Sequence, residues 1–300
     1  MTQFIRTGVF AAASVIYLSC PLLAEAAAGN ASSGTVALTP SPLARRYTEG
    51  ETLNYRITGA GVNNGPGYYG EAASTVKKSA EGVFYEELKW SKVRELGQEV
   101  KLPEDFRQYV SLEPAFKHVM PGLMYSPFLD SFNFYVDLML AIKQPAIRKP
   151  GDRAYIKRSL PNSWAYGATL VGYDCIDFDI TFTELNESSG TASVLVKHVP
   201  PPAGCSTKPP ADWMNKPVLD TANNFFQVKK TSEGKYSVMV GKEFFNVDVR
   251  LALPSGRILS AVMYNPVEGV ARVCSDEKLS DCGAPEKFSL VRNITMELAP

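Results

Sequence analysis

Alternation of apolar and polar residues with a period of two is the feature that most constrains how this chain folds. It is clearest in Ile176–Thr183, where Ile, Phe, Ile and Phe alternate with Asp, Asp, Thr and Thr. The same period begins at Leu53, recurs in Phe84–Trp90 and returns in Phe245–Leu251. Successive side chains of an extended strand point to opposite faces, so this pattern predicts half-buried β-strands along most of the chain.

Short polar turns separate several of these strands. Glu187–Gly190 precedes a strand predicted at Thr191–Val199, while Ser232–Gly234 and Pro254–Gly256 divide the strands of the C-terminal third. Turns this short join antiparallel neighbours, because parallel strands need a long crossover connection. The expected sheet is therefore an antiparallel meander.

One segment has a different pattern and predicts a helix over residues 127–144. Ser126 is the expected N-cap, Pro127 takes the first helical position and Pro145 ends the helix. Proline suits the first turn, where its missing N–H has no partner to lose, and it stops a helix that reaches it from the N-terminal side.

The predicted helix is apolar over most of its circumference. Its polar residues form a narrow stripe of Asp130, Asn133 and Asp137, which we expect to be solvated. A helix this apolar must be largely buried. The economical arrangement is a mainly β, β-rich α+β fold, in which a strongly curved antiparallel sheet or half-barrel wraps around one long buried helix.

The N-terminal residues have the pattern of a secretory signal. Arg6 supplies a positive charge, Val9–Leu23 is apolar and uncharged, and Ala24–Ala26 fits a small-x-small cleavage site. This predicts a signal peptide over residues 1–26 and a periplasmic or extracellular protein. The alternative is a lipid anchor on Cys20, although the residues before it match such a signal poorly.

The remaining chain divides into two predicted parts. Residues 27–46 are rich in Gly, Ala, Ser, Thr and Pro without periodicity, which is typical of a flexible linker. Residues 47–300 are expected to form a single β-rich domain, since a sequence that is 45% hydrophobic can build a full core. The 31 basic and 31 acidic residues balance, so no overall field favours nucleic acid as a partner.

Cysteine usage agrees with export. If Cys20 leaves with the signal, four cysteines remain, Cys175, Cys205, Cys274 and Cys282. An even number fits disulfides in an oxidising compartment, and four cysteines allow three pairings. The short segment between Cys274 and Cys282 favours that local pair, which leaves Cys175 with Cys205. No pair has the two-residue spacing of structural zinc, so neither a metal nor a cofactor is expected.

Residues that could carry catalysis are sparse. The chain has two histidines, His118 and His198, and we expect His198 to be packed or at a sheet rim rather than a general base. Ser74–Lys77 matches a Ser-x-x-Lys pattern, but it lies in a strand-like segment and the accompanying motifs are missing. No catalytic residue is assigned.

Two carboxylate pairs lack the spacing that a catalytic or metal site requires. Asp130 and Asp137 share a helix face, but seven residues separate their backbones by about 10 Å, beyond the usual range of a glycosidase pair. Asp177 and Asp179 project from one strand face, yet they lack the glycine turn and terminal glutamate of a calcium loop.

Three segments resemble a known family. They are Glu51–Gly59, Gly82–Val93 with its aromatic strand, and Gly241–Asn265, which begins with Gly-Lys-Glu-Phe and leads into Pro266-Val267. With the cleaved signal and the helix that plugs a curved sheet, these segments resemble the bacterial periplasmic lipoprotein-localisation factors and related exported half-barrel proteins of unknown function. The resemblance implies an apolar cavity able to hold acyl chains.

Large aromatic and apolar side chains are the candidates for lining such a cavity. Gly65–Gly70 contains two tyrosines in a glycine-rich loop that could cover it. The full set of cavity candidates is Tyr68, Tyr69, Trp90, Phe132, Tyr135, Met139, Trp164 and Trp213.

Three hypotheses of function follow from the sequence. The leading one is an exported, non-enzymatic binding protein of the cell envelope that holds a lipid-like apolar ligand in the hollow of the sheet. The first alternative is an envelope structural or protein-interaction module that uses the proline-rich segment Pro200–Pro217 and its sheet edges. The second is a hydrolase with an unrecognised site, for which His198 is the residue to test.

Overall fold

The computed structural model describes residues 40–60, 67–116, 125–157, 163–165, 169–172, 176–200, 209–218 and 223–300. For residues 163–165 and 169–172 the description covers the backbone alone. The expectations for the signal peptide, Cys20, His118, Cys175 and Cys205, and for the side chain of Trp164, therefore lie outside the described residues.

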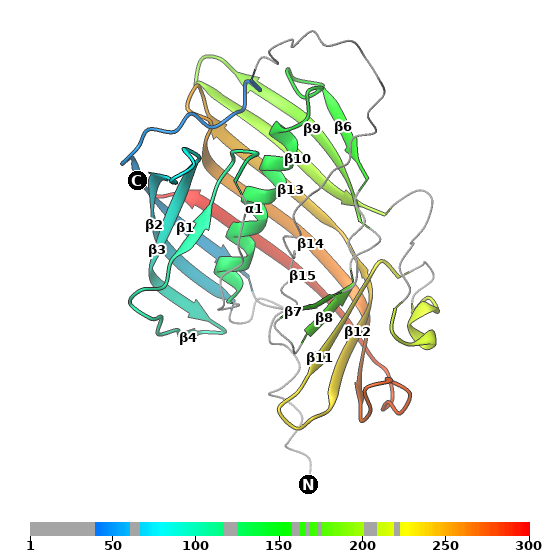
Figure 1. Cartoon of the computed structure of the whole chain (residues 1–300). Coiled ribbons are helices and arrows are strands. Elements are labelled where there is room, and N and C mark those ends of the chain that lie inside the picture. The colour runs from blue at the N-terminus through cyan, green and yellow to red at the C-terminus, as the bar shows by residue number, and fades with distance from the viewer. Residues whose placement is uncertain are drawn as a thin grey trace.

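The fold is mainly β, as the alternation predicts, and every pairing among the described strands is antiparallel. The strands are β1 Thr52–Gly59, β2 Tyr68–Lys78, β3 Phe84–Glu95, β4 Gln98–Glu99, β5 Gln108–Val110, β6 Arg153–Ile156, β7 Ser163–Ala165, β8 Thr169–Gly172, β9 Asp177–Asn186, β10 Thr191–Val199, β11 Phe225–Lys230, β12 Tyr236–Glu243, β13 Phe245–Ala252, β14 Arg257–Cys274 and β15 Glu286–Leu298. They form one open sheet, and the helix α1, Ser126–Ile142, lies in its hollow (Figure 1). The predicted curved sheet around a helix is confirmed.

The sheet branches at β14, which is the longest strand. The first half of β14 pairs with β13, its second half pairs with β12, and its other edge follows β15 from Ser260 to Ala271. Strands β13, β10, β9 and β6 continue one branch, while β12, β11, β8 and β7 form a smaller lobe below α1 in Figure 1. The chain thereby builds two sheet surfaces from one central pair of strands.

The smaller branch pairs with β14 along β12, and two glycines lie opposite each other in this pairing. Gly241 on β12 pairs with Gly269 on β14, and a Cβ added to Gly241 would lie 2.0 Å from the carbonyl oxygen of Glu268. No side chain fits at that distance, so only glycine lets the two backbones approach this closely.

The helix is completely buried. Every residue of α1 is buried, and the helix contacts β1, β2, β5, β10 and β13. Its bounds differ by one to two residues from the predicted 127–144, and Ser126 is its first residue rather than its N-cap. The N-cap position is occupied by Tyr125, and Glu95 of β3 receives the bonds from the Ser126 backbone N–H and hydroxyl instead, at 3.2 and 2.6 Å.

The packed chain begins before the predicted boundary at residue 47. Leu43 is fully buried in the main core, and Arg45 is 7% exposed. Arg46 donates its backbone N–H to the carbonyl of Ser255 at 2.8 Å, so this segment is held against the β13–β14 turn. The linker interpretation is wrong for residues 40–46, because Leu43 and Arg45 find partners that are distant in sequence.

The smaller lobe has its own apolar cluster, which contains Met214, Phe226, Val238 and Leu279. The short 3-10 helix η2, Asp212–Asn215, packs on it. A disulfide joins Cys274 to Cys282 beside this cluster, so the predicted local pairing is confirmed. No helix among the described residues is both long and apolar enough to cross a membrane.

Candidate functional site

A cleft opens at the outer edge of β3, where that strand lacks a continuous neighbour. Its outer edge pairs with β5 at Glu86–Leu88 and with β4 at Arg94–Glu95. Between these pairings the chain from Glu99 to Arg107 leaves the strand and encloses a cleft of about 480 Å³ over Lys89–Val93. We call this space the edge cleft; its volume is within the range of small-molecule sites.

The floor of the edge cleft is aromatic and fixed in position. The Trp90 indole N–H donates to Gln108 Oε1 at 3.0 Å, and the Gln108 amide donates to the carbonyl of Phe128 on α1 at 2.8 Å. The Phe128 ring lies 4.9 Å from that of Trp90 and 4.8 Å from that of Phe106. The indole is thus held by a hydrogen bond and by ring contacts, and Trp90 lines the cleft with 8% of its surface exposed.

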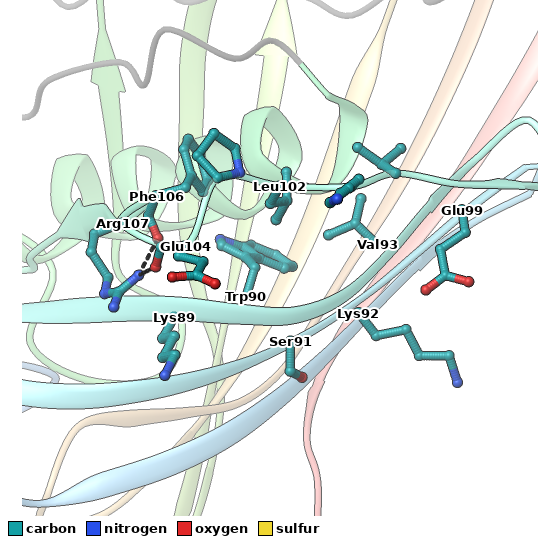
Figure 2. A pocket seen from close by; sticks show the side chains of 13 residues that line it. Lys89, Trp90, Ser91, Lys92, Val93, Glu99, Leu102, Glu104, Phe106 and Arg107 are labelled. Carbon is teal, nitrogen blue, oxygen red and sulfur yellow. Dashed lines mark hydrogen bonds between the residues drawn. The ribbon is translucent and has the colours of Figure 1, made fainter.

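Apolar and charged side chains separate across β3. Figure 2 shows Trp90 and Val93 on the side of the strand that faces Leu102, and Lys89 and Lys92 on the opposite side. The residues lining the cleft carry four positive charges, on Lys89, Lys92, Lys101 and Arg107, against two negative charges, on Glu99 and Glu104. The edge cleft therefore has apolar side chains on one side of β3 and a lining of net positive charge, part of which lies on the opposite side of the strand.

Of the predicted cavity residues with a described side chain, Trp90 lines this cleft. Phe132, Tyr135 and Met139 are buried in the main core at 0, 1 and 4% exposure, where they help α1 to fill the hollow of the sheet. Trp213 packs on the cluster of the smaller lobe, with its indole N–H donating to the carbonyl of Leu279 at 2.9 Å.

The two tyrosines of the glycine-rich loop have separate environments. Tyr68 donates its hydroxyl to Asp130 at 2.5 Å, and burial, reinforced by the charge of Asp130, raises the pKa of Tyr68 well above its usual value. Tyr69 faces the other side of β2, where it donates to Glu71 and lies under the ammonium group of Lys92. The structure does not bring these two hydroxyls together.

The polar stripe of α1 is buried rather than solvated, which corrects the expectation from sequence. Asp130, Asn133 and Asp137 are 0, 1 and 1% exposed, because the curved sheet closes over the helix and supplies partners to both aspartates. Arg292 of β15 donates to both oxygens of Asp130 at 2.9 Å. We call this row of three residues with its partners on the sheet the helix seam.

His198 of β10 lies at the far end of the helix seam. Its Nε2 is 3.3 Å from Oδ2 of Asp137, and both side chains are 1% exposed. The rings of Phe178 and Phe245 lie 4.6 Å from the imidazole on two sides. His198 is therefore packed in the core, one of the two placements expected from sequence, but it also faces a carboxylate that the sequence did not assign to it.

Three buried polar atoms on or near the helix seam make no hydrogen bond: Asn133 Nδ2, Asp137 Oδ1 and Glu243 Oε1. Burial raises the pKa of Glu243 to about 8, although Arg292 and Asn265 act in the opposite direction. An unpaired buried polar group costs about 1–3 kcal/mol of folding free energy. Three such atoms therefore call for a structural or functional explanation.

The other predicted pairs form ordinary contacts. Arg153 binds Asp179 at 2.6 Å, and Tyr155 donates to Asp177, which leaves both carboxylates engaged across the β6–β9 pair. In the part of the chain that the structure describes, no group of three or more His, Cys, Asp and Glu side chains could hold a metal ion.

The Ser-x-x-Lys segment lies in strand β2, and its serine and lysine make separate contacts there. Ser74 faces inward and donates to Glu86 at 2.6 Å, whereas Lys77 points outward to Glu87 at 2.9 Å. Residues three apart on a strand lie on opposite faces, so the lysine cannot reach the serine.

Several residues of the two sites escaped sequence reasoning. Gln108 and Phe106 reach the edge cleft from a segment without periodicity, which carried no signal. Arg292 did carry one, since it occupies the apolar register of its strand, where a charge indicates a buried partner.

No protein-family model, no curated protein and no solved structure matches this chain. The resemblance to periplasmic lipoprotein-localisation factors thus stays a prediction.

Proposed function

We propose that this protein is an exported, non-enzymatic binding protein of the cell envelope, and that it holds an amphiphilic ligand with an apolar chain and an anionic head in the edge cleft. The observation that carries the proposal is the cleft itself, which has Trp90 on one side of β3 and four basic residues in its lining, two of them, Lys89 and Lys92, on the opposite side of the strand. An apolar face with a few charged groups at its rim is the usual composition of a small-molecule site.

The position of the ligand differs from the one expected from sequence. The hollow of the sheet is occupied by α1, whose residues are all buried, so we place the ligand beside the helix at the open edge of β3. The acyl chain lies along Trp90 and Leu102, and the head reaches past the open edge of β3 toward Lys89 and Lys92 on the opposite side of the strand. The disulfide between Cys274 and Cys282 is compatible with the oxidising compartment that export implies.

Direct binding of defined amphiphiles tests the proposal. The mature protein is titrated with laurate, which carries a carboxylate, and with monolaurin, which carries the same chain and no charge. We expect laurate to bind more tightly and to lose affinity as salt is added, because the rim charges are exposed and screened. Equal affinity for both, or none for either, contradicts the proposal.

Two pairs of variants locate the site. Leu102→Trp fills the cleft and is expected to weaken laurate binding by about tenfold, a loss of ~1.4 kcal/mol in binding free energy. Its control is Leu185→Trp, at an exposed position of β9. Lys89→Glu with Lys92→Glu reverses the rim charge, and the same double change at Lys229 and Lys230 on β11 is its control. Binding that survives both cleft variants places the ligand elsewhere.

The Asp137–His198 pair keeps a hydrolase as the second candidate. An aspartate that holds a histidine is part of the acid–base machinery of many hydrolases, although here both groups are shut in the core. A screen against ester substrates with the native protein and His198→Ala tests this candidate, and an activity unchanged in the variant excludes it.

A further inference from the structure

Two unpartnered polar atoms belong to residues about one helical turn apart on α1, of which Asp137 faces His198 of β10. Asn133 Nδ2 and Asp137 Oδ1 make no hydrogen bond, although each residue is 1% exposed. Asp137 is fixed in this orientation by its other oxygen, Oδ2, which lies 3.3 Å from Nε2 of His198. Side chains four residues apart are neighbours on one helix face, with Cβ atoms about 5–6 Å apart, so one small group can reach both atoms.

The two atoms have opposite hydrogen-bonding requirements. The Asn133 amide N–H needs an acceptor, and the Asp137 carboxylate oxygen needs a donor. A hydroxyl group meets both, because its oxygen accepts from Asn133 while its hydrogen is donated to Asp137.

Other chemical groups fit less well. A carbonyl could accept from Asn133 but has no hydrogen for Asp137, and an ammonium group could bond Asp137 but cannot accept from the amide. An amide N–H is a hydrogen-bond donor and cannot ligate a metal ion. In addition, the described residues contain no metal-binding group of three or more His, Cys, Asp and Glu side chains.

We propose that Asn133 and Asp137 form a buried hydroxyl-binding site between α1 and β10, separate from the edge cleft. The hydroxyl belongs either to a trapped water molecule or to a small alcohol. The site holds this group rather than activating it, because the hydroxyl contacts the carboxylate, whereas in a catalytic triad it contacts the imidazole. Phe178 and Phe245 stand against the imidazole and exclude bulk water from that side.

A crystal structure of the mature protein, combined with its native mass, tests this site and separates the two sources. We expect a density peak about 2.7–3.2 Å from both Asn133 Nδ2 and Asp137 Oδ1. A single water-sized peak with no added mass identifies trapped water, and extended density with an added mass identifies an alcohol. A site without density, with the Asn133 amide bonded directly to Asp137 or another protein group, overturns the proposal.

A matched pair of variants checks that the two side chains hold the hydroxyl. Asn133→Leu removes the donor at similar volume and is expected to lose the peak, while Asn293→Leu on the exposed face of β15 keeps it. A peak that persists in Asn133→Leu overturns the assignment. If that variant does not fold, the density and native mass of the unaltered protein decide the question.

Discussion

Glu86 shows at the scale of one residue how the core accommodates a charge. Its carboxylate receives bonds from Arg45 Nε at 3.3 Å, Ser74 Oγ at 2.6 Å and Tyr135 Oη at 2.7 Å. Burial, with the charge of Glu86 adding to it, raises the pKa of Tyr135 well above its usual value, so the phenol remains a neutral donor. The group ties the N-terminal segment, β2, β3 and α1 together at one point.

Removing one partner of the Arg45–Glu86 pair should be strongly destabilising. Both side chains are at most 2% exposed, so Arg45→Met leaves the Glu86 charge buried and uncompensated, and we expect a loss of about 3–5 kcal/mol. Arg56→Met is the matched control, because its partner Glu297 lies on the surface and exposed pairs contribute less than about 1 kcal/mol. Urea unfolding followed by tryptophan fluorescence measures both, and equal losses would contradict the argument.

Glu243 predicts a pH dependence of stability. Burial raises its pKa to about 8 in the folded protein from an ordinary value of about 4.5, so the folded state holds a proton that the unfolded state releases between these two values. Stability therefore falls as the pH rises from about 4.5 to about 8. The groups that face Glu243 are Arg292, Asn265 and the side-chain amide of Asn224, which binds the backbone of Glu243.

Glu243→Gln tests that dependence. The uncharged amide has no proton to release, so the difference between the stabilities of variant and native protein should grow in favour of the variant from pH 5 to pH 8. Urea unfolding at three pH values measures it. A difference that stays constant over this interval would show that Glu243 is ionised in the folded state.

At the scale of the elements, α1 depends on the sheet for its N-terminus as well as for its burial. Its N-cap residue, Tyr125, makes no side-chain capping bond, and the first turn contains no acidic residue. Glu95, at the end of β3, provides the acceptor for the backbone N–H of Ser126. The helix terminus and the strand that borders the edge cleft are thus joined by one carboxylate.

Glu95→Ala should therefore act as the loss of a helix cap. We expect a destabilisation of about 0.5–2 kcal/mol, together with weaker ligand binding at the edge cleft, since β3 forms one side of it. Glu99→Ala on the exposed β4 is the control for stability, because its carboxylate caps no helix. Thermal unfolding followed by circular dichroism distinguishes them, and a Glu95→Ala protein as stable as the native one would refute the capping role.

At the scale of the whole molecule, the branch at β14 divides the apolar residues into two clusters. The main cluster surrounds α1, and the second lies in the smaller lobe beside the Cys274–Cys282 disulfide. The two share β12 and β14. On β12, Val238 and Val240 belong to the second cluster and Met239 packs on the main one, whereas on β14 residues up to Val267 belong to the main cluster and Cys274 to the second. Local unfolding of the smaller lobe can thus leave the packing around α1 intact.

Loss of the disulfide should loosen the smaller lobe first. Replacing Cys274 and Cys282 together by serine frees a loop with a sequence separation of 8, which costs about 2–3 kcal/mol in the chain-entropy model. Hydrogen exchange is expected to quicken in β11 and β12 while the amides of α1 stay protected. Equal acceleration in α1 would show that the two clusters unfold as one unit.

The candidate site was only partly predictable from sequence. Trp90 was singled out as an aromatic at the end of an alternating strand, and it does line the edge cleft. Phe132 and Met139 were chosen on the same grounds and lie in the core instead. Large apolar residues fill cores and line pockets with the same composition, so periodicity alone does not separate the two roles.

The sequence by itself determined what depends on neighbours along the chain. Strand alternation follows from the period of an extended backbone, the antiparallel turns from their length, and the Cys274–Cys282 bond from a short separation. The tertiary structure alone decided the branch at β14, the burial of Asp130 and Asp137, and the opening beside Trp90. These depend on which distant strands pair and where pairing stops, and the partners that make a buried carboxylate tolerable become visible only once the sheet has closed over the helix.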